Sequence, residues 1–223
     1  MKVIITGASR GIGFEMVKQF LSNGDQVMAI SRNKVKLIKL EKLGAKILAF
    51  DLANEDFSAL IDAVKSFGRI DILINNAGVL VNKSLRNMTN EDIKNVYNVN
   101  VFSIIKLTRD LLPHFSNDAH IVNISSVGGV QGSVKFPGLS VYSSSKGAIS
   151  ILTECLAEEF KENSIRFNAL ALGAVQTEML REAFPDYEAN ISSKEMANYI
   201  YRFATQDGKF FNGKILTVSS SNP

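Results

Sequence analysis

The sequence predicts an α/β fold: a doubly wound parallel sheet of about seven strands, with helices on both faces in three layers. Short runs rich in β-branched residues alternate with longer segments of helical period, which is typical of βαβ units. Glycines such as Gly24, Gly44 and Gly68 follow several helical segments, where helices commonly end. Ligands of such sheets bind beyond the carboxyl ends of the strands, so we expect the chemistry there.

The expected elements run in regular alternation along the chain. We expect strands at residues 3–6, 26–31, 45–50, 70–75, 120–124, 165–170 and 214–218. We expect helices at residues 11–21, 34–43, 57–67, 90–115, 142–161 and 194–204. At roughly 150 residues per domain, a chain of 223 residues is expected to form one domain, residues 1–223, that carries both a cofactor site and a substrate site.

Composition excludes several classes of protein. Hydrophobic residues make up 46% and charged residues 21%, which indicates a soluble globule with a sizeable core rather than a disordered chain. The net charge of +3 is too small to indicate a nucleic-acid or membrane-surface binder. No stretch approaches the ~18 apolar residues of a spanning helix, and Gly7 and Arg10 interrupt the apolar start of the chain, so we expect a cytoplasmic protein.

Cysteine and histidine usage points to no metal. The single cysteine, Cys155, excludes an intrachain disulfide and a cysteine-rich zinc site. His114 and His120 are not spaced as metal ligands with any carboxylate. We therefore expect a reducing compartment and no metal.

A glycine-spaced turn, Thr6-Gly7-Ala8-Ser9-Arg10-Gly11-Ile12-Gly13, joins the first strand to the first helix. Backbone N–H groups and the positive helix end converge there, which suits a pyrophosphate, and glycines allow close approach. A plain strand-to-helix turn needs one glycine rather than three at fixed offsets. The motif resembles the cofactor loop of short-chain dehydrogenases/reductases, with Gly7, Ser9, Arg10, Gly11, Ile12 and Gly13 as contacts.

The resemblance extends in the expected order from Thr6 to the last strand, and it implies a Rossmann-type fold that binds a nicotinamide dinucleotide. Asp51, with Leu52, follows the third strand, where the family places an aspartate near the adenine ring. The segment that ends the fourth strand matches the family's N-N-A-G motif, which lines the cofactor site through Asn76, Ala77 and Gly78. The family's catalytic residues correspond to Asn100, Ser126, Tyr142 and Lys146. The resemblance also implies that Tyr142 and Lys146 contact the cofactor, Lys146 through the ribose.

Tyr142 and Lys146 have the spacing of neighbours on one helix face, about 5–6 Å apart at Cβ. A nearby ammonium favours a phenolate, so we expect Lys146 to lower the pKa of Tyr142 toward that of a working general acid–base. Spacing alone also fits an ordinary exposed helix face.

The resemblance assigns roles to the other two residues. Ser126 would hold the substrate oxygen, and its neighbour Ser125 would point to the opposite face of the strand. Asn100 would help hold a water that links Lys146 to solvent, although asparagines also satisfy buried backbone groups.

Charge after the second strand favours NADP(H) over NAD(H). An NAD site usually has an acidic side chain there for the ribose 2′-hydroxyl, whereas this chain has Ser31 and Arg32, which could receive a 2′-phosphate together with Arg10. The alternative is that both arginines are solvated surface residues. Further along, Gly173, Val175 and Thr177 resemble the family's contacts to the nicotinamide carboxamide, with Leu172 in place of the usual proline.

Two segments near the expected substrate site differ from the family's usual pattern. Residues 130–136 lengthen the Ser126 to Tyr142 connection, so Gln131, Ser133 and Lys135 either touch a polar substrate group or are solvated. Residues 178–192 are short for a lid, which predicts a fairly open pocket, and Ser192 to Glu195 reads as a capping box.

The sequence therefore predicts an NADP(H)-dependent oxidoreductase. It would transfer a hydride between the nicotinamide and a small carbonyl or secondary alcohol, with Tyr142 as general acid–base. Alternatives are a non-catalytic dinucleotide sensor or scaffold, an isomerase or epimerase with bound NAD, and, as a specific activity, 3-oxoacyl carrier-protein reduction. The resemblance also implies a homodimer or homotetramer, paired through the helices at 90–115 and 142–161.

Overall fold

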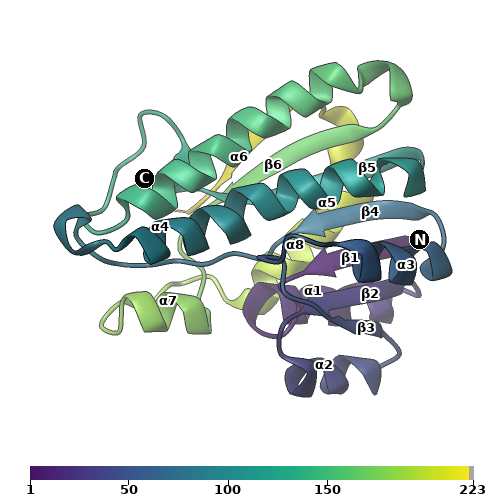
Figure 1. Cartoon of the computed structure of the whole chain (residues 1–223), viewed down its shortest axis with the longest axis horizontal. Coiled ribbons are helices and arrows are strands. Elements are labelled where there is room, and N and C mark those ends of the chain that lie inside the picture. Colours follow the sequence, from purple (N-terminus) through teal and green to yellow (C-terminus); the bar gives the residue numbers. More distant parts are fainter. Residues whose placement is uncertain (221–223) are drawn as a thin grey trace.

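The computed structural model describes residues 1–220, and its centre is a sheet of seven parallel strands in the order β3-β2-β1-β4-β5-β6-β7 (Figure 1). The sheet confirms the predicted doubly wound fold, because its strand order reverses direction beside β1, the first strand. The strands are β1 (Lys2–Thr6), β2 (Gln26–Ser31), β3 (Lys46–Ala49), β4 (Ile70–Asn75), β5 (Phe115–Ser126), β6 (Arg166–Leu172) and β7 (Lys214–Val218).

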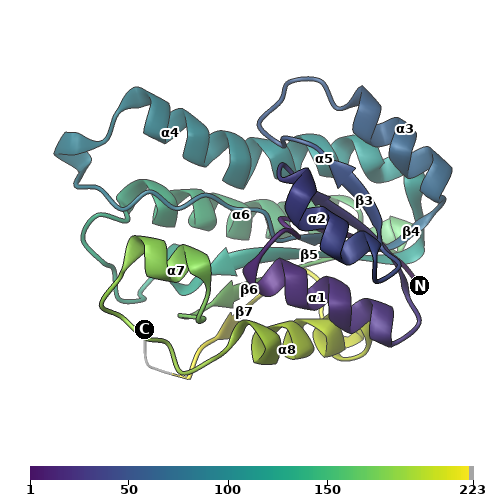
Figure 2. The same cartoon turned by 90° about the horizontal axis from the view of Figure 1, so that it is seen from below.

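Helices cover both faces of this sheet, as predicted (Figure 2). One face packs against α1 (Gly11–Ser22), α2 (Lys34–Glu41) and α8 (Ser193–Thr205). The other packs against α3 (Ser58–Phe67), α5 (Ser103–Leu111) and α6 (Ser140–Glu159). Alternation along β1 explains the two cores, because Val3 and Ile5 belong to the first and Ile4 to the second. Residues 1–220 contain no helix that is long and apolar enough to cross a membrane.

The single helix expected at residues 90–115 is wrong in detail. The structure has α4 (Asn90–Tyr97), a π-helical turn (Asn98–Phe102), α5 and a 3₁₀ turn (Leu112–His114), and β5 already begins at Phe115. Asn100, inside the π turn, hydrogen-bonds both backbone groups of Val79, on the segment after β4. Periodicity cannot reveal such an extra residue in a turn, because the apolar stripe continues on both sides of it.

One short helix was missed. Helix α7 (Glu178–Ala183) begins after Thr177, whose hydroxyl accepts a hydrogen bond from the backbone N–H of Leu180 at 3.1 Å. Six residues are too few for a periodic signal, and the N-cap residue Thr177 was the one sequence signal that could have revealed this helix. The predicted capping box is confirmed: Ser192 and Glu195 bind each other's backbone N–H groups at the start of α8.

Candidate active site

A cavity of about 710 Å³ opens at the carboxyl ends of the strands. Except for Asn100, every residue that the sequence nominated for catalysis or cofactor binding lines it: Gly7, Ser9, Arg10, Gly11, Ile12, Gly13, Ser31, Arg32, Asp51, Leu52, Asn76, Ala77, Gly78, Ser126, Tyr142, Lys146, Gly173, Val175 and Thr177. The volume is in the usual range of about 300–1,000 Å³ for a ligand site.

The glycine loop between β1 and α1 is packed too tightly for side chains. Gly7 has φ +68°, and a Cβ there would lie 2.7 Å from the Cα of Ala77. A Cβ on Gly13 would lie 2.3 Å from the carbonyl oxygen of Gly7. Glycine at these two positions thus lets the loop pack against the segment after β4 with the N-terminal end of α1 at the cavity, an arrangement that fits a pyrophosphate.

Thr6 and Asn76 fix this loop, and sequence reasoning missed the part played by Thr6. The Thr6 hydroxyl accepts hydrogen bonds from the backbone N–H groups of Asn76 and Ala77, both at 3.0 Å. In return, the Asn76 side chain donates to the carbonyl oxygen of Thr6 at 3.0 Å. These bonds join the carboxyl ends of β1 and β4, the two strands at which the sheet order reverses.

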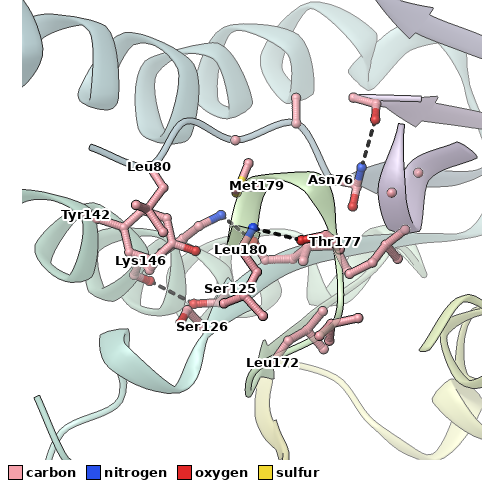
Figure 3. A pocket seen from close by; sticks show the side chains of 18 of the residues that line it. Asn76, Leu80, Ser125, Ser126, Tyr142, Lys146, Leu172, Thr177, Met179 and Leu180 are labelled. Atoms are coloured by element: carbon pink, nitrogen blue, oxygen red, sulfur yellow. Dashed lines mark hydrogen bonds between the residues drawn. The ribbon is translucent and has the colours of Figure 1, made fainter. Parts of the chain in front are cut away.

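Ser126, Tyr142 and Lys146 converge on the same part of the cavity (Figure 3). Ser126 ends β5 and is hydrogen-bonded to Tyr142, and its Oγ also accepts from the backbone N–H of Gly128 at 3.2 Å. Lys146 lies one helical turn after Tyr142 on α6, with its Nζ 5.8 Å from the centroid of the Tyr142 ring. The Lys146 ammonium donates to the carbonyl oxygen of Ile124 at 2.8 Å.

Burial controls the protonation of both α6 residues. It raises the pKa of Tyr142 to about 12, against the opposing effect of the hydrogen bond with Ser126. It lowers the pKa of Lys146 to about 8, because the buried ammonium loses its hydration. The expectation that Lys146 lowers the pKa of Tyr142 is therefore wrong for this structure: removal of the phenolate from water dominates, and the Lys146 ammonium is directed at Ile124.

Asn100 lies behind the cavity wall and is fully buried. Its amide donates to the carbonyl oxygen of Val79 at 3.0 Å and to Ser145 Oγ at 2.9 Å, and its Oδ1 accepts from Val79 N–H at 2.8 Å. Asn100 therefore satisfies buried backbone groups, the alternative role considered from the sequence. The same Oδ1 and the Lys146 Nζ each lie 3.6 Å from where a Cβ on Gly78 would be, so Gly78, which lines the cavity, lies beside both groups.

Ser125 and a chain of buried amides hold α6 in place. Ser125 Oγ donates to the carbonyl oxygen of Lys146 at 3.0 Å and lies 3.2 Å from Ser150 Oγ. One layer deeper, the Asn75 amide donates to Asn123 Oδ1 at 2.8 Å, and the Asn123 amide donates to Thr153 Oγ1 at 2.9 Å. These bonds tie β4, β5 and α6 together, which fixes the angle at which Tyr142 and Lys146 enter the cavity.

The two arginines nominated for a 2′-phosphate differ in their surroundings. Arg32 lines the cavity just beyond β2, beside Ser31. Arg10 also lines it, but its guanidinium binds both carboxylate oxygens of Glu182, on α7. Arg10, which the sequence nominates to join Ser31 and Arg32 at a 2′-phosphate, is therefore paired with an acid in this structure.

The end of the cavity beyond Tyr142 is apolar. Figure 3 shows Leu80, Met179 and Leu180 around Tyr142, and Phe136 and Leu139 add to the same lining. None of the three polar loop residues considered from the sequence is part of this lining. Two of them bond their own loop instead: Ser133 Oγ donates to the carbonyl oxygen of Val127 at 2.5 Å, and Lys135 Nζ donates to that of Val130 at 2.7 Å.

Comparison with known proteins agrees with this geometry. Residues 1–188 match the family described as short chain dehydrogenase. The chain is 33% identical over 244 residues to 2-(R)-hydroxypropyl-CoM dehydrogenase of Xanthobacter autotrophicus. This alignment covers 98% of this chain and 96% of that protein.

Solved structures with this fold carry either cofactor. A 4-hydroxyisoleucine dehydrogenase complexed with NADH superimposes with a TM-score of 0.89 at 26% identity, covering 99% of this chain and 97% of that one. A short chain dehydrogenase from Burkholderia cenocepacia J2315 in complex with NADP gives 0.86 at 27% identity, with 99% and 96% covered. The chain therefore belongs to the short-chain dehydrogenase/reductase family and is an oxidoreductase that acts on CH–OH or C=O groups.

Proposed function

We propose that this protein is an NADP(H)-dependent carbonyl reductase or alcohol dehydrogenase that uses Tyr142 as its general acid–base. The observation that carries the proposal is the convergence of Ser126, Tyr142 and Lys146 on a cavity whose other end is the glycine loop. A binding protein without turnover would have no chemical use for a hydroxyl pair and a buried lysine in contact with the cavity.

The glycine loop would hold the dinucleotide through its backbone N–H groups, with Asp51 and Leu52 beside the adenine and Val175 and Thr177 beside the nicotinamide. When bound, the nicotinamide donates or accepts the hydride. In the reducing direction, Ser126 donates a hydrogen bond to the substrate carbonyl oxygen, which positions it and stabilises the negative charge that develops there. Tyr142 then protonates that oxygen.

The protonation states suit reduction more than oxidation. With a pKa of about 12, Tyr142 is protonated at neutral pH, so it is ready to act as an acid. Lys146, with a pKa of about 8, exchanges protons near neutrality and can replace the proton that Tyr142 gives up. Asn100, behind the wall at Gly78, would hold the water that connects Lys146 to solvent.

Ser31 and Arg32 carry the preference for NADP(H). A 2′-phosphate beyond β2 would meet a guanidinium and a hydroxyl, and an acidic side chain of the kind that binds a free 2′-hydroxyl is absent from positions 31 and 32. The two solved relatives named above hold NADH in one case and NADP in the other, so the proposed preference rests on these side chains.

We also propose a cytoplasmic homo-oligomer in which one domain of each copy carries the complete site. Phe102, Ile105 and Ile151 are exposed on the π turn, α5 and α6, the segments through which the family resemblance implies pairing. Light scattering of the purified chain measures the mass directly, and a mass of 24.5 kDa would overturn this part of the proposal.

The test is NADPH oxidation against a panel of ketones, aldehydes and a 3-oxoacyl thioester, run in parallel with NADH. The proposal expects turnover of at least one carbonyl, with the larger kcat/KM from NADPH. Tight NADPH binding without turnover of any carbonyl would favour the sensor, and a larger kcat/KM from NADH would overturn the cofactor preference.

A further inference from the structure

The ion pair between Arg10 and Glu182 joins the cofactor loop to the lid side of the cavity. Arg10 is the residue just before α1, and Glu182 lies in the last turn of α7, 172 positions later. The guanidinium meets the carboxylate with two nitrogens on two oxygens, and the Nη2 to Oε2 distance is 3.0 Å. Such a paired geometry uses the face of a guanidinium that a phosphate would also use.

The surroundings add to the negative charge at Arg10. Glu178, at the start of α7, has its Oε2 3.5 Å from where a Cβ on Gly11 would lie, so its carboxylate also faces the cofactor loop. The pKa of Arg10 is raised by its bond with Glu182 and further by the charge of Glu178, and the same bond lowers the pKa of Glu182. Glu182 therefore stays ionised beside the arginine at neutral pH.

Helix α7 has no buried residue, and its C-terminal end meets the segment after β4. The Asn82 side chain donates to the carbonyl oxygen of Ala183 at 2.9 Å, and a smaller polar pocket lies between this helix and the segment after β4. Glu182 keeps 61% of its side chain exposed and Arg10 keeps 36%. The ion pair is therefore accessible to water and to a competing anion.

We propose that Glu182 is a specificity-determining residue that competes with the cofactor's 2′-phosphate for Arg10. Glu182 occupies the fork formed by Nη1 and Nη2, and this fork holds one carboxylate or phosphate at a time. NADP(H) therefore binds with the separation of Arg10 from Glu182, whereas NAD(H), which lacks the 2′-phosphate, binds with the ion pair intact. Glu182 thus reduces the discrimination that Arg10 and Arg32 alone would give, and it links the choice of cofactor to the docking of α7.

The inference rests on the proposed preference for NADP(H), and the two are tested with fragments that need no turnover. The probes are 2′,5′-ADP and 5′-AMP, which differ by the 2′-phosphate, and the readout is Kd by calorimetry at low salt. We expect Glu182→Gln to bind 2′,5′-ADP about two- to fivefold more tightly, the fold-change of a half-exposed ion pair, and 5′-AMP unchanged. Glu188→Gln removes the same charge from an exposed position farther along the segment and is the matched control.

The Arg10→Met background separates competition from a general charge effect. There, Glu182→Gln should no longer change the affinity for 2′,5′-ADP. Hydrogen exchange gives a second readout: the amides of Glu178–Ala183 should exchange faster when 2′,5′-ADP is bound than when 5′-AMP is bound.

The outcomes distinguish the inference from the proposed function. Equal affinity of the unchanged protein for the two probes, with no effect of Arg10→Met, would overturn the cofactor preference itself. Weakened binding of 2′,5′-ADP by Arg10→Met, together with no effect of Glu182→Gln, would overturn only the competition. Tighter binding by Glu182→Gln that persists without Arg10, or that Glu188→Gln reproduces, would also overturn it.

Discussion

The buried ammonium of Lys146 should cost stability, and Lys146→Met should recover part of it. The side chain is 3% exposed, and its pKa falls from 10.5 to about 8 because burial strips the charged form of water. The unfolded chain therefore holds this proton more tightly than the folded one. Linkage then requires the stability of the unchanged protein to rise with pH between about 8 and 10.5, as the folded-state lysine becomes neutral.

The pH dependence gives the magnitude. With these two pKa values, the cost of the lysine to the free energy of unfolding is about 3 kcal/mol at pH 7 and about 1.4 kcal/mol at pH 9.5. Methionine has a similar shape and no charge, so the advantage of Lys146→Met should shrink by about 2 kcal/mol over this interval. The bond that the neutral amine makes with the carbonyl oxygen of Ile124 contributes roughly 0.5–1.5 kcal/mol at either pH, so its loss lowers the absolute advantage of methionine and leaves the trend unchanged.

Urea unfolding of both proteins at pH 7 and pH 9.5 measures this difference. Groups that titrate equally in the two proteins cancel from the difference between their free energies of unfolding. The measurement does not require either protein to be active. A free-energy difference between the variants that stays constant across the two pH values would refute the account of Lys146 as a desolvated ammonium.

Three further predictions concern the serine pair, an unused histidine and the glycine loop. Ser126→Ala should lower kcat by ~10²-fold, because it removes one hydrogen-bond donor to the developing oxyanion. Ser125→Ala should change kcat only a few-fold and lower the free energy of unfolding by ~1 kcal/mol. Equal effects of the two substitutions on kcat would contradict the roles assigned to the two serines. Burial lowers the pKa of His120 from 6.5 to about 4 in the folded state. Between these two pH values the unfolded chain binds a proton at His120 and the folded chain does not, so the free energy of unfolding falls as the pH falls from 6.5 to 4. From pH 7 to pH 4.5, the free energy of unfolding measured in urea should fall by about 2 kcal/mol more in the unchanged protein than in His120→Gln. An equal fall in the two proteins would contradict this. Gly13→Ala places a Cβ 2.3 Å from the Gly7 oxygen, so NADPH affinity measured by fluorescence should fall at least ~10-fold, and unchanged affinity would show that the loop can yield.

Much of this fold could be predicted because its central strands are buried on both faces and turn residues bound its strands. β2, β4 and β7 lie at the predicted bounds, since turn residues and helical periods delimit their apolar runs. The π turn around Asn98–Phe102 could not be predicted, because it adds one residue to a turn without breaking the apolar stripe. Helix α7 was missed because six residues carry no periodic signal.

The site was predictable where chemistry follows strand ends and fixed spacings, and less so where it depends on distant contacts. The glycine loop and Tyr142 with Lys146 are local patterns, so the sequence locates them. The bond between Arg10 and Glu182 joins residues 172 positions apart, and only the docking of α7 brings them together. Burial likewise decides the pKa of Tyr142, because the packing that removes water from the phenol is not visible in the spacing of two residues.

The central claim is that Tyr142 supplies the proton during hydride transfer. Single-turnover reduction by prebound NADPH, with the best carbonyl substrate from the panel, measures that step directly in the unchanged protein and in Tyr142→Phe. The account predicts a rate at least ~10²-fold lower in Tyr142→Phe with NADPH Kd unchanged, because the phenyl ring keeps the shape of the cavity and lacks the acid. A Tyr142→Phe rate within a few-fold of that of the unchanged protein would contradict it.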